Sequence, residues 1–156
     1  MILKKIEGLS SAKNVAFRFL GIRPRSVKEM VDKLSAKGFS PDLVDQTISY
    51  LKQHQFLDDE HFARDWVSCR LKRPYGINKI ILELKQQKGV DSKIVAEAIQ
   101  AAQENYDEEA IVLQLAHKRA ARYKDLDPVK LKKRTFDYLA QRGFTLDSIN
   151  KVIKQL

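Results

Sequence analysis

The residue types that usually build catalytic and metal centres are few in this sequence and lie far apart. Three histidines, at positions 54, 61 and 117, and the single Cys69 lack the spacing of zinc ligands. The acidic run Asp58-Asp59-Glu60 could be imagined as a metal cluster, but acids at a helix start are more simply explained by capping and the helix dipole. Each glycine stands alone, so there is no phosphate-binding loop. The sequence therefore predicts no catalytic residues, no cofactor and no metal site.

A second group of residues is suited to recognising a polyanion or an acidic surface. Arg70, Lys72 and Arg73 form the densest basic connector and are flanked by Trp66 and Tyr75. We expect Trp66 to lie in the core, because it is on the apolar face of a predicted helix. Tyr75 lies between proline and glycine, where its ring could be exposed beside the cations. Arginines near an exposed aromatic ring suit a phosphate backbone and an acidic protein groove equally well.

Composition indicates a folded protein of a reducing compartment. The 156 residues are 44% apolar and 31% charged, which is typical of a globular chain. The formal net charge of +9 favours a polyanionic or acidic partner. A single cysteine gives no disulfide framework, and no apolar run is long enough for a signal peptide or a membrane span. We expect a cytoplasmic protein that does not bind membranes.

A motif that occurs three times predicts how these residues are positioned. An apolar helical stripe ends in a basic residue, a glycine and another apolar residue, and the glycines recur at intervals of about 50 residues. The three copies are Leu34–Phe39, Leu84–Val90, which is one residue longer, and Leu139–Phe144. Glycine can take the left-handed conformation that closes a helix, and the apolar residue after it packs on the last turn.

A new helix is expected to follow each glycine. The capping residues that open these helices are Ser40, Asp91 and Thr145. The first helix of the chain is expected to begin at Ser10 or Ser11, and Asp58 is expected to cap the helix that opens the second repeat. No segment shows the alternation of a strand. We predict an all-α fold of three tandem three-helix repeats that form an elongated, curved array. The predicted repeats are residues 1–55, 56–105 and 106–156.

Basic charge recurs with the repeat. Residues 1–37, 64–88 and 117–134 carry nine, seven and eight Lys or Arg against three, two and two acids. These bands fall on the first helix, the connector and the second helix of each repeat, which favours a basic binding surface. Six residues in or beside the first two connectors are not needed for the core, and we select them as candidate partner-binding or DNA-binding residues. They are Arg23, Arg25, Lys72, Arg73, Tyr75 and Lys79.

In their order along the chain, these motifs resemble those of the bacterial regulatory protein RecX family. The segments that carry the resemblance are Arg23–Ser26, Lys37–Phe39, Phe56–Asp59, Phe62–Ala63, Tyr75–Ile77, Glu83–Leu84, Lys88–Gly89, Tyr138–Leu139 and Arg142–Phe144. The resemblance implies three tandem three-helix repeats and no catalytic activity. It also implies binding to the RecA recombinase, chiefly its filament on DNA, with inhibition of ATP hydrolysis, strand exchange and coprotease function.

Two readings from other classes stay open at this point. One is a helix-turn-helix regulator that binds DNA directly, although the helices after the glycines are acidic or mixed and are poor major-groove readers. The other is a passive scaffold whose charge serves solubility. Weak binding to single- or double-stranded DNA is compatible with the basic surface. No heptad pattern argues for a dimer, so we expect a monomer.

Overall fold

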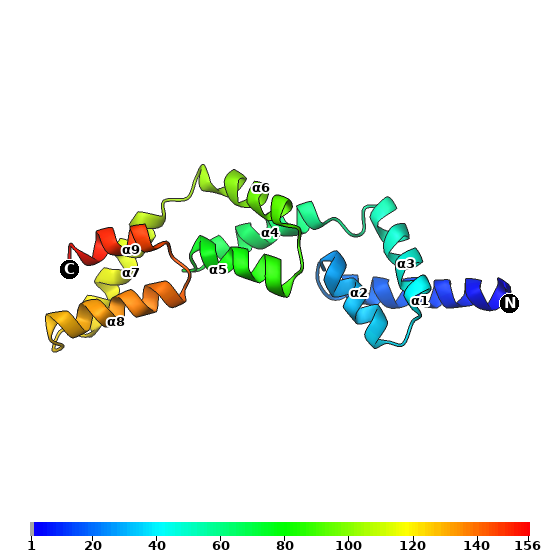
Figure 1. The fold of residues 1–156 in the computed structure, drawn as a ribbon, viewed down its shortest axis with the longest axis horizontal. Coiled ribbons are helices and arrows are strands. Elements are labelled where there is room, and N and C mark those ends of the chain that lie inside the picture. The colour runs from blue at the N-terminus through cyan, green and yellow to red at the C-terminus, as the bar shows by residue number, and fades with distance from the viewer. Residues whose placement is uncertain (1) are drawn as a thin grey trace. The chain divides into compact units, whose positions relative to one another are not determined.

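The computed structural model describes residues 2–156, with side chains from Gly8 onward. This part of the chain forms nine α-helices and one π-helical turn, and contains no strand (Figure 1). The helices are α1 (Ile2–Ile22), α2 (Val27–Ala36), α3 (Pro41–Gln53), α4 (Asp59–Leu71), α5 (Ile77–Leu82), α6 (Ser92–Gln103), α7 (Glu108–Arg122), α8 (Pro128–Gln141) and α9 (Leu146–Ile153). The expected all-α fold is confirmed. Among the described helices, none combines the length and the apolar character that a bilayer span requires.

The chain divides into two compact units. One unit contains the residues up to Ala63 together with Leu84–Val95, and the other contains Arg64–Glu83 together with Ala96–Leu156. The middle group of helices therefore contributes to both units, so a compact unit is not the same as a repeat. The repeat boundaries given above stay a prediction.

The first unit is built on the packing of α1, α2 and α3. Its buried cluster contains Ala16 from α1, Met30 and Leu34 from α2, and Val44 and Leu51 from α3. These residues come from the helical stripes that the sequence shows, because one face of each amphipathic helix must be shielded from water.

The expected start of the first helix is wrong. Helix α1 begins at Ile2, so that Ser10 and Ser11 lie inside it and cap nothing. Gly8 does not interrupt the helix, and it serves a packing role. A Cβ at Gly8 would lie 3.1 Å from Cδ1 of Leu43, so the missing side chain lets α1 and α3 approach closely. Serine is a common capping residue, which suggested a helix start at Ser10 or Ser11, but the helical backbone continues through both positions.

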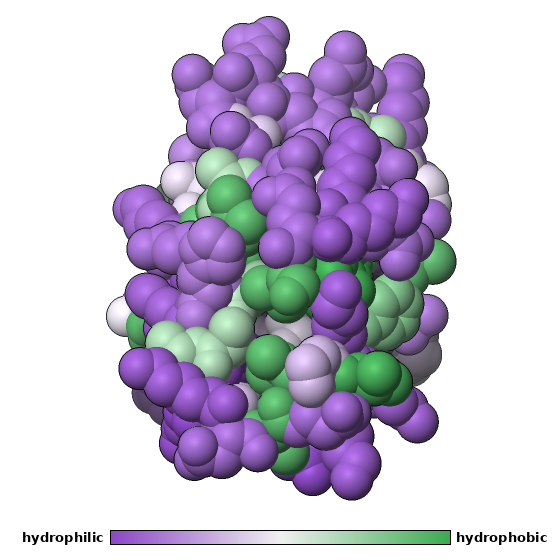
Figure 2. Space-filling view, turned by 90° about the vertical axis from the view of Figure 1, so that its left-hand side faces the viewer, coloured by the Kyte–Doolittle hydropathy of each residue, from purple (hydrophilic) through white to green (hydrophobic). Residues whose placement is uncertain are grey.

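The second unit has its own core where α7, α8 and α9 meet. The buried cluster contains Val112 and Ala116 from α7, Leu139 from α8, and Ile149 and Val152 from α9. Figure 2 shows a face on which hydrophilic residues cover most of the surface, with apolar residues among them.

The three glycine turns form as the sequence predicts. Gly38, Gly89 and Gly143 have positive φ angles of 87°, 63° and 82°. The amides of Phe39 and Phe144 donate to the carbonyls of Leu34 and Leu139, which closes the last turns of α2 and α8. The predicted caps also form, because carboxylate or hydroxyl oxygens of four side chains accept amides of the following first turn. These residues are Ser40, Asp58, Asp91 and Thr145.

A π-helical turn absorbs the extra residue of the second copy. The turn spans Glu83–Gln87 and directly continues α5. The amide of Val90 then donates to the carbonyl of Leu84 over 3.0 Å, a reach one residue longer than in the other two turns. Leu84 is fully buried, as Leu34 and Leu139 are. The wider turn therefore keeps the apolar stripe in register with its glycine despite the insertion.

Candidate partner-binding surface

The connector before α2 is held by a glycine turn from the middle group of helices. Ser26 caps α2 by accepting the amide of Glu29, and its hydroxyl also donates to the carbonyl of Lys88 over 2.6 Å. Gly89 lies directly against Lys28, because a Cβ at Gly89 would be 2.2 Å from Cδ of that lysine. The N-terminus of α2 is therefore covered by the turn that follows the π-helical segment.

An acidic residue outside the connector completes this contact. The amide of Val27 donates to Oδ1 of Asp59 over 2.9 Å. Asp59 therefore caps α2 and not its own helix, while the neighbouring Asp58 caps α4 by accepting the amide of His61. Capping explains these two carboxylates of the acidic run, and the described residues contain no cluster of metal ligands.

The same kind of contact recurs in the second unit, between the connector before α5 and the turn after α8. The amide of Gly76 donates to the carbonyl of Arg142 over 2.8 Å, and that of Asn78 donates to the carbonyl of Gly143 over 3.0 Å. A Cβ at Gly143 would lie 2.4 Å from the amide nitrogen of Lys79. The positive end of the α5 dipole thus meets the negative end of the α8 dipole. We call the two contacts the first and second junctions.

The first junction contains a half-buried charge cluster. Glu29 accepts two hydrogen bonds from the Arg23 guanidinium, at 2.7 and 3.1 Å, and one from Nζ of Lys88 at 2.7 Å. Its carboxylate also accepts the amide of Ser26. Burial acts to raise the pKa of Glu29, but these hydrogen bonds outweigh it and lower that pKa to about 2. The guanidinium of Arg23 therefore stabilises the first junction through its pair with Glu29.

Arg25 lies in the same connector and has a different environment. Its guanidinium is 5.7 Å from the ring centroid of Phe19, and its Nε is buried without a hydrogen-bond partner among the described residues. Burial and the charge of Arg23 lower its pKa. Stacking on Phe19 therefore takes the place of an ion pair for this cation.

A row of alternating rings and guanidinium groups runs through the second unit, and we call it the arginine–aromatic strip. Its members, in order, are Trp66, Arg70, Tyr75, Arg142, Tyr138, Arg119 and Tyr123, and all of them are half-buried. The successive distances from guanidinium carbon to ring centroid are 4.7, 5.5, 5.7, 4.6, 4.2 and 5.3 Å. Helices α4, α7 and α8 and the connector before α5 all contribute to it.

The strip holds more positive than negative charge. Glu83, which is 6% exposed, pairs with Nε of Arg70 at 2.8 Å and accepts the indole N–H of Trp66 at 3.1 Å. Trp66 was expected in the core, and it is half-buried with its polar edge tied to this carboxylate. Arg119 and Arg142 form no ion pair with a carboxylate of the described part of the chain. Nη1 of Arg142 donates to the carbonyl of Pro74 over 3.1 Å, and its remaining N–H groups, together with the charge of Arg119, are available to an external acidic group.

Stacking determines what the strip can bind. An arginine whose flat face lies on an aromatic ring keeps its N–H edge free for bidentate bonds to a carboxylate or a phosphate. Because the rings also fix the side chains, less conformational entropy is lost when a partner binds. The arrangement is therefore suited to acidic groups presented by a protein or by nucleic acid.

Four of the six residues selected from the sequence lie in the second unit and two in the first. Tyr75 belongs to the strip, and Nζ of Lys79 lies 4.4 Å from its ring centroid. Arg73 is exposed and borders a small hollow beside Trp66 and Arg70, whereas Lys72 is exposed on the other side of the connector. Arg23 and Arg25 lie at the first junction.

Sequence reasoning missed the part of the strip that comes from α7 and α8. Arg119, Tyr138 and Arg142 are distant in sequence from the basic connector, and only the second junction brings them to it. One signal was present, because Tyr138 and Arg142 are four residues apart and must share a helix face.

Three consecutive three-helix groups joined by docked helix ends, with a cationic surface and no metal cluster in the described residues, define a helical-repeat protein of the binding type. Three family models match the chain in tandem. They describe the first three-helix domain of RecX at residues 12–51, the second at residues 58–99 and the third at residues 107–153. The chain belongs to the RecX family, which is a family of regulatory proteins.

Relatives and solved structures agree with this assignment. The regulatory protein RecX of Chlorobium phaeobacteroides is 36% identical over 144 residues, which cover 92% of this chain and 91% of the relative. That of Pasteurella multocida is 31% identical over 135 residues, covering 86% and 81%. The crystal structure of RecX from Lactobacillus salivarius superposes with a TM-score of 0.83 at 25% identity, covering 97% of both chains. The predicted tandem three-helix architecture is confirmed.

Proposed function

We propose that this protein is a negative modulator of the RecA recombinase. It binds the RecA filament on DNA as a monomer in the cytoplasm, and it inhibits ATP hydrolysis, strand exchange and coprotease function without an enzymatic activity of its own. The regulatory name of its relatives supports a regulatory role. The partner comes from the resemblance of the sequence motifs to those of the family.

The observation that carries the proposal is the arginine–aromatic strip. A nucleoprotein filament presents acidic side chains and DNA phosphates, and stacked arginines bind both. Arg119 and Arg142 are held by rings and not by carboxylates of the described residues, so a partner does not have to break an ion pair to reach them. The strip therefore offers a prearranged cationic surface.

Direct DNA binding is a second candidate function. The same N–H edges accept phosphates, and such contacts weaken steeply with salt. Recognition of base sequence by a helix in the major groove is less favoured, because two of the three helices that follow the glycine turns carry an acid in their first turn. Asp42 lies in the first turn of α3 and Asp147 in that of α9.

The experiment replaces two candidate cations that flank the strip. Arg73→Glu combined with Lys79→Glu should raise the concentration needed to inhibit the RecA ATPase by about tenfold or more, because two attractive charges become repulsive. Lys133→Glu with Arg134→Glu makes the same charge change at exposed positions of α8 and serves as the control. Both variants should keep the helical circular dichroism of the parent.

Two outcomes would redirect the proposal. Undiminished inhibition by the Arg73 and Lys79 variant would place the interface elsewhere. Co-sedimentation with RecA filaments, and with naked single- and double-stranded DNA at two salt concentrations, separates the candidates. Loss of binding to naked DNA with inhibition retained would assign the strip to direct DNA binding.

A further inference from the structure

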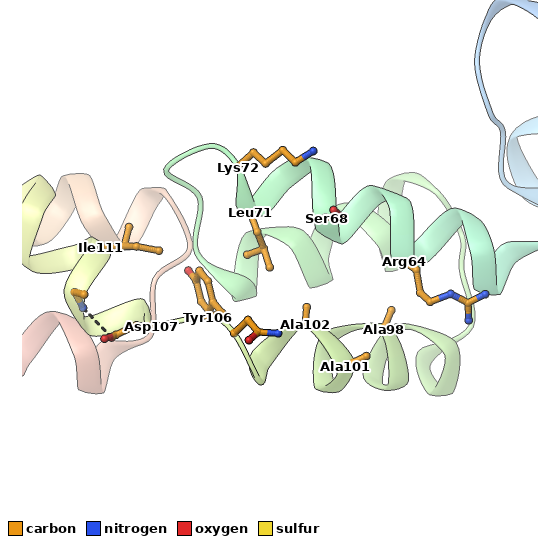
Figure 3. A pocket seen from close by; sticks show the side chains of 12 residues that line it. Arg64, Ser68, Leu71, Lys72, Ala98, Ala101, Ala102, Tyr106, Asp107 and Ile111 are labelled. Atoms are coloured by element: carbon orange, nitrogen blue, oxygen red, sulfur yellow. Dashed lines mark hydrogen bonds between the residues drawn. The ribbon is translucent and has the colours of Figure 1, made fainter.

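A groove in the second unit is not used by the proposed function. It lies between α4 and α6 and reaches the start of α7, with a volume of about 650 Å³. Its apolar lining includes Leu71, Ala98, Ala101, Ala102, Tyr106 and Ile111. Figure 3 shows the methyl groups of Ala98 and Ala102 pointing towards α4, with Leu71 pointing back from α4. Small residues on one wall and larger apolar residues on the others leave a trough along two helices.

Two cations lie at the wall of the groove that α4 and the start of the following connector provide. Arg64 and Lys72 both line it and both are exposed. Arg64 lies on α4, and Lys72 follows directly after the last residue of that helix. The eight-residue separation of the two positions corresponds to roughly 12 Å along the helix direction. Neither forms an ion pair with a carboxylate of the described part of the chain. The groove therefore combines an apolar floor with two positive charges about two helical turns apart.

Two of the polar residues that line the groove already form hydrogen bonds within the protein, which argues against a small polar ligand. The hydroxyl of Tyr106 donates to the carbonyl of Tyr75 over 3.4 Å, and Asp107 accepts the amide of Ala110 over 3.0 Å (Figure 3). A small-molecule site needs a few directed polar groups that fix the ligand. An amphipathic helix instead needs a long apolar trough for residues at positions i, i+3, i+4 and i+7, with charges at its edge.

We propose that this groove seats an amphipathic α-helix of an acidic protein partner. Its apolar residues enter between α4 and α6, where the alanines let its backbone come close. Two of its carboxylates, about two turns apart, pair with Arg64 and Lys72. This inference rests on the proposed function in one respect, because it names the filament protein as the source of the helix.

A designed peptide tests the chemistry of the groove without any RecA. The probe is a fluorescein-labelled helix of about 16 residues with leucines at i, i+3, i+4 and i+7 and glutamates eight positions apart. Fluorescence anisotropy with the full chain should show saturable binding. A peptide with lysines in place of the glutamates should bind at least about tenfold more weakly, because both edge contacts become repulsive. Equal binding of the two peptides, or no binding of either, would overturn the proposal.

Filling the groove provides the matched test of its position. Ala101→Trp places a large ring in the trough from an exposed position, and Gln100→Trp places the same ring on an exposed neighbour outside it. Ala101→Trp should lower the affinity for the glutamate peptide at least about tenfold. Gln100→Trp should leave that affinity within about twofold of the value for the unmodified protein. If the two variants behave alike, the groove is not the binding site.

The RecA ATPase assay then separates this inference from the proposed function. Ala101→Trp should inhibit RecA less than Gln100→Trp does. If it inhibits equally while the peptide still discriminates, the filament protein does not supply the helix and that part of the inference is wrong. If the unmodified protein does not inhibit RecA at all, the proposed function fails, and the peptide result alone decides whether the groove is a helix-binding site.

Discussion

Arginines in this protein have two distinct roles that depend on what lies beside them. Arg23 forms a bidentate pair with Glu29, a carboxylate whose side chain is only 13% exposed. Arg119 and Arg142 stack on tyrosine rings and have no such partner among the described residues. The first arrangement stabilises the fold. The second leaves N–H groups for binding, apart from Nη1 of Arg142, which donates to the carbonyl of Pro74.

Glu29 should make stability depend on acid pH. Its pKa falls from an ordinary value of 4.5 to about 2 in the folded protein. The ionised carboxylate therefore stabilises the fold fully above the unfolded pKa, and this contribution is lost as the pH falls towards the folded value. Glu29→Gln should lower the free energy of unfolding near neutral pH by on the order of 2 kcal/mol and weaken its dependence on pH between about 5 and 2.

Denaturant unfolding at several pH values checks this expectation. Asp32→Asn is the matched control, because Asp32 pairs with Lys28 on the surface and the two side chains are 60% and 50% exposed. It should change stability by less than about 1 kcal/mol at any pH. If the free energy of unfolding falls with decreasing pH equally steeply in the Glu29 variant and in the unmodified protein, the charge cluster does not provide this stabilisation.

The sequence predicted the local partner of Glu29 but not its distant ones. Ser26 and Glu29 have the spacing of a capping box, and both of its bonds form. Lys88 is 59 residues away and reaches Glu29 only because the glycine turn after it docks on α2. Local rules predict bonds within a turn of helix, and they contain no information on which element covers that turn.

At the scale of elements, contacts between helix ends connect consecutive three-helix groups. The glycine turns were predictable because left-handed backbone strongly favours glycine, and all three form. The docking of two of these turns on the N-termini of α2 and α5 could not be predicted, because a contact between backbone groups does not require any particular residue type. The π-helical turn was visible only as one additional residue before Gly89.

The glycine turns should differ in their sensitivity to an added methyl group. At Gly38, where a Cβ would meet no atom within 4 Å, alanine should cost about 1 kcal/mol through backbone strain alone. At Gly143 the Cβ would press on the backbone of Lys79, so alanine should cost at least about 3 kcal/mol. Urea unfolding of Gly38→Ala and Gly143→Ala gives both values. Equal losses would mean that the second junction does not form in solution.

At the scale of the molecule, the tandem domains are established and their arrangement stays a prediction. The sequence predicts an elongated, curved array, because each short repeat leans on its neighbour. A compact globule of 156 residues would have a radius of gyration of roughly 15 Å. Small-angle scattering should give a clearly larger value and an asymmetric distance distribution. A value near that of the globule would refute the elongated array.

The helix starts along the chain differ in how their first amides are satisfied. Gly76 offers no side-chain cap, so the start of α5 depends on carbonyls from the next repeat. Helix α8 starts differently, because Asp127 caps it by accepting the amide of Lys130 and Pro128 has no N–H to donate. Helix α2 combines the two devices, because Ser26 caps it and also donates to the carbonyl of Lys88. Neighbouring repeats therefore share backbone donors and acceptors across their borders, and opening the second junction would leave the amides of Gly76 and Asn78 to be solvated by water.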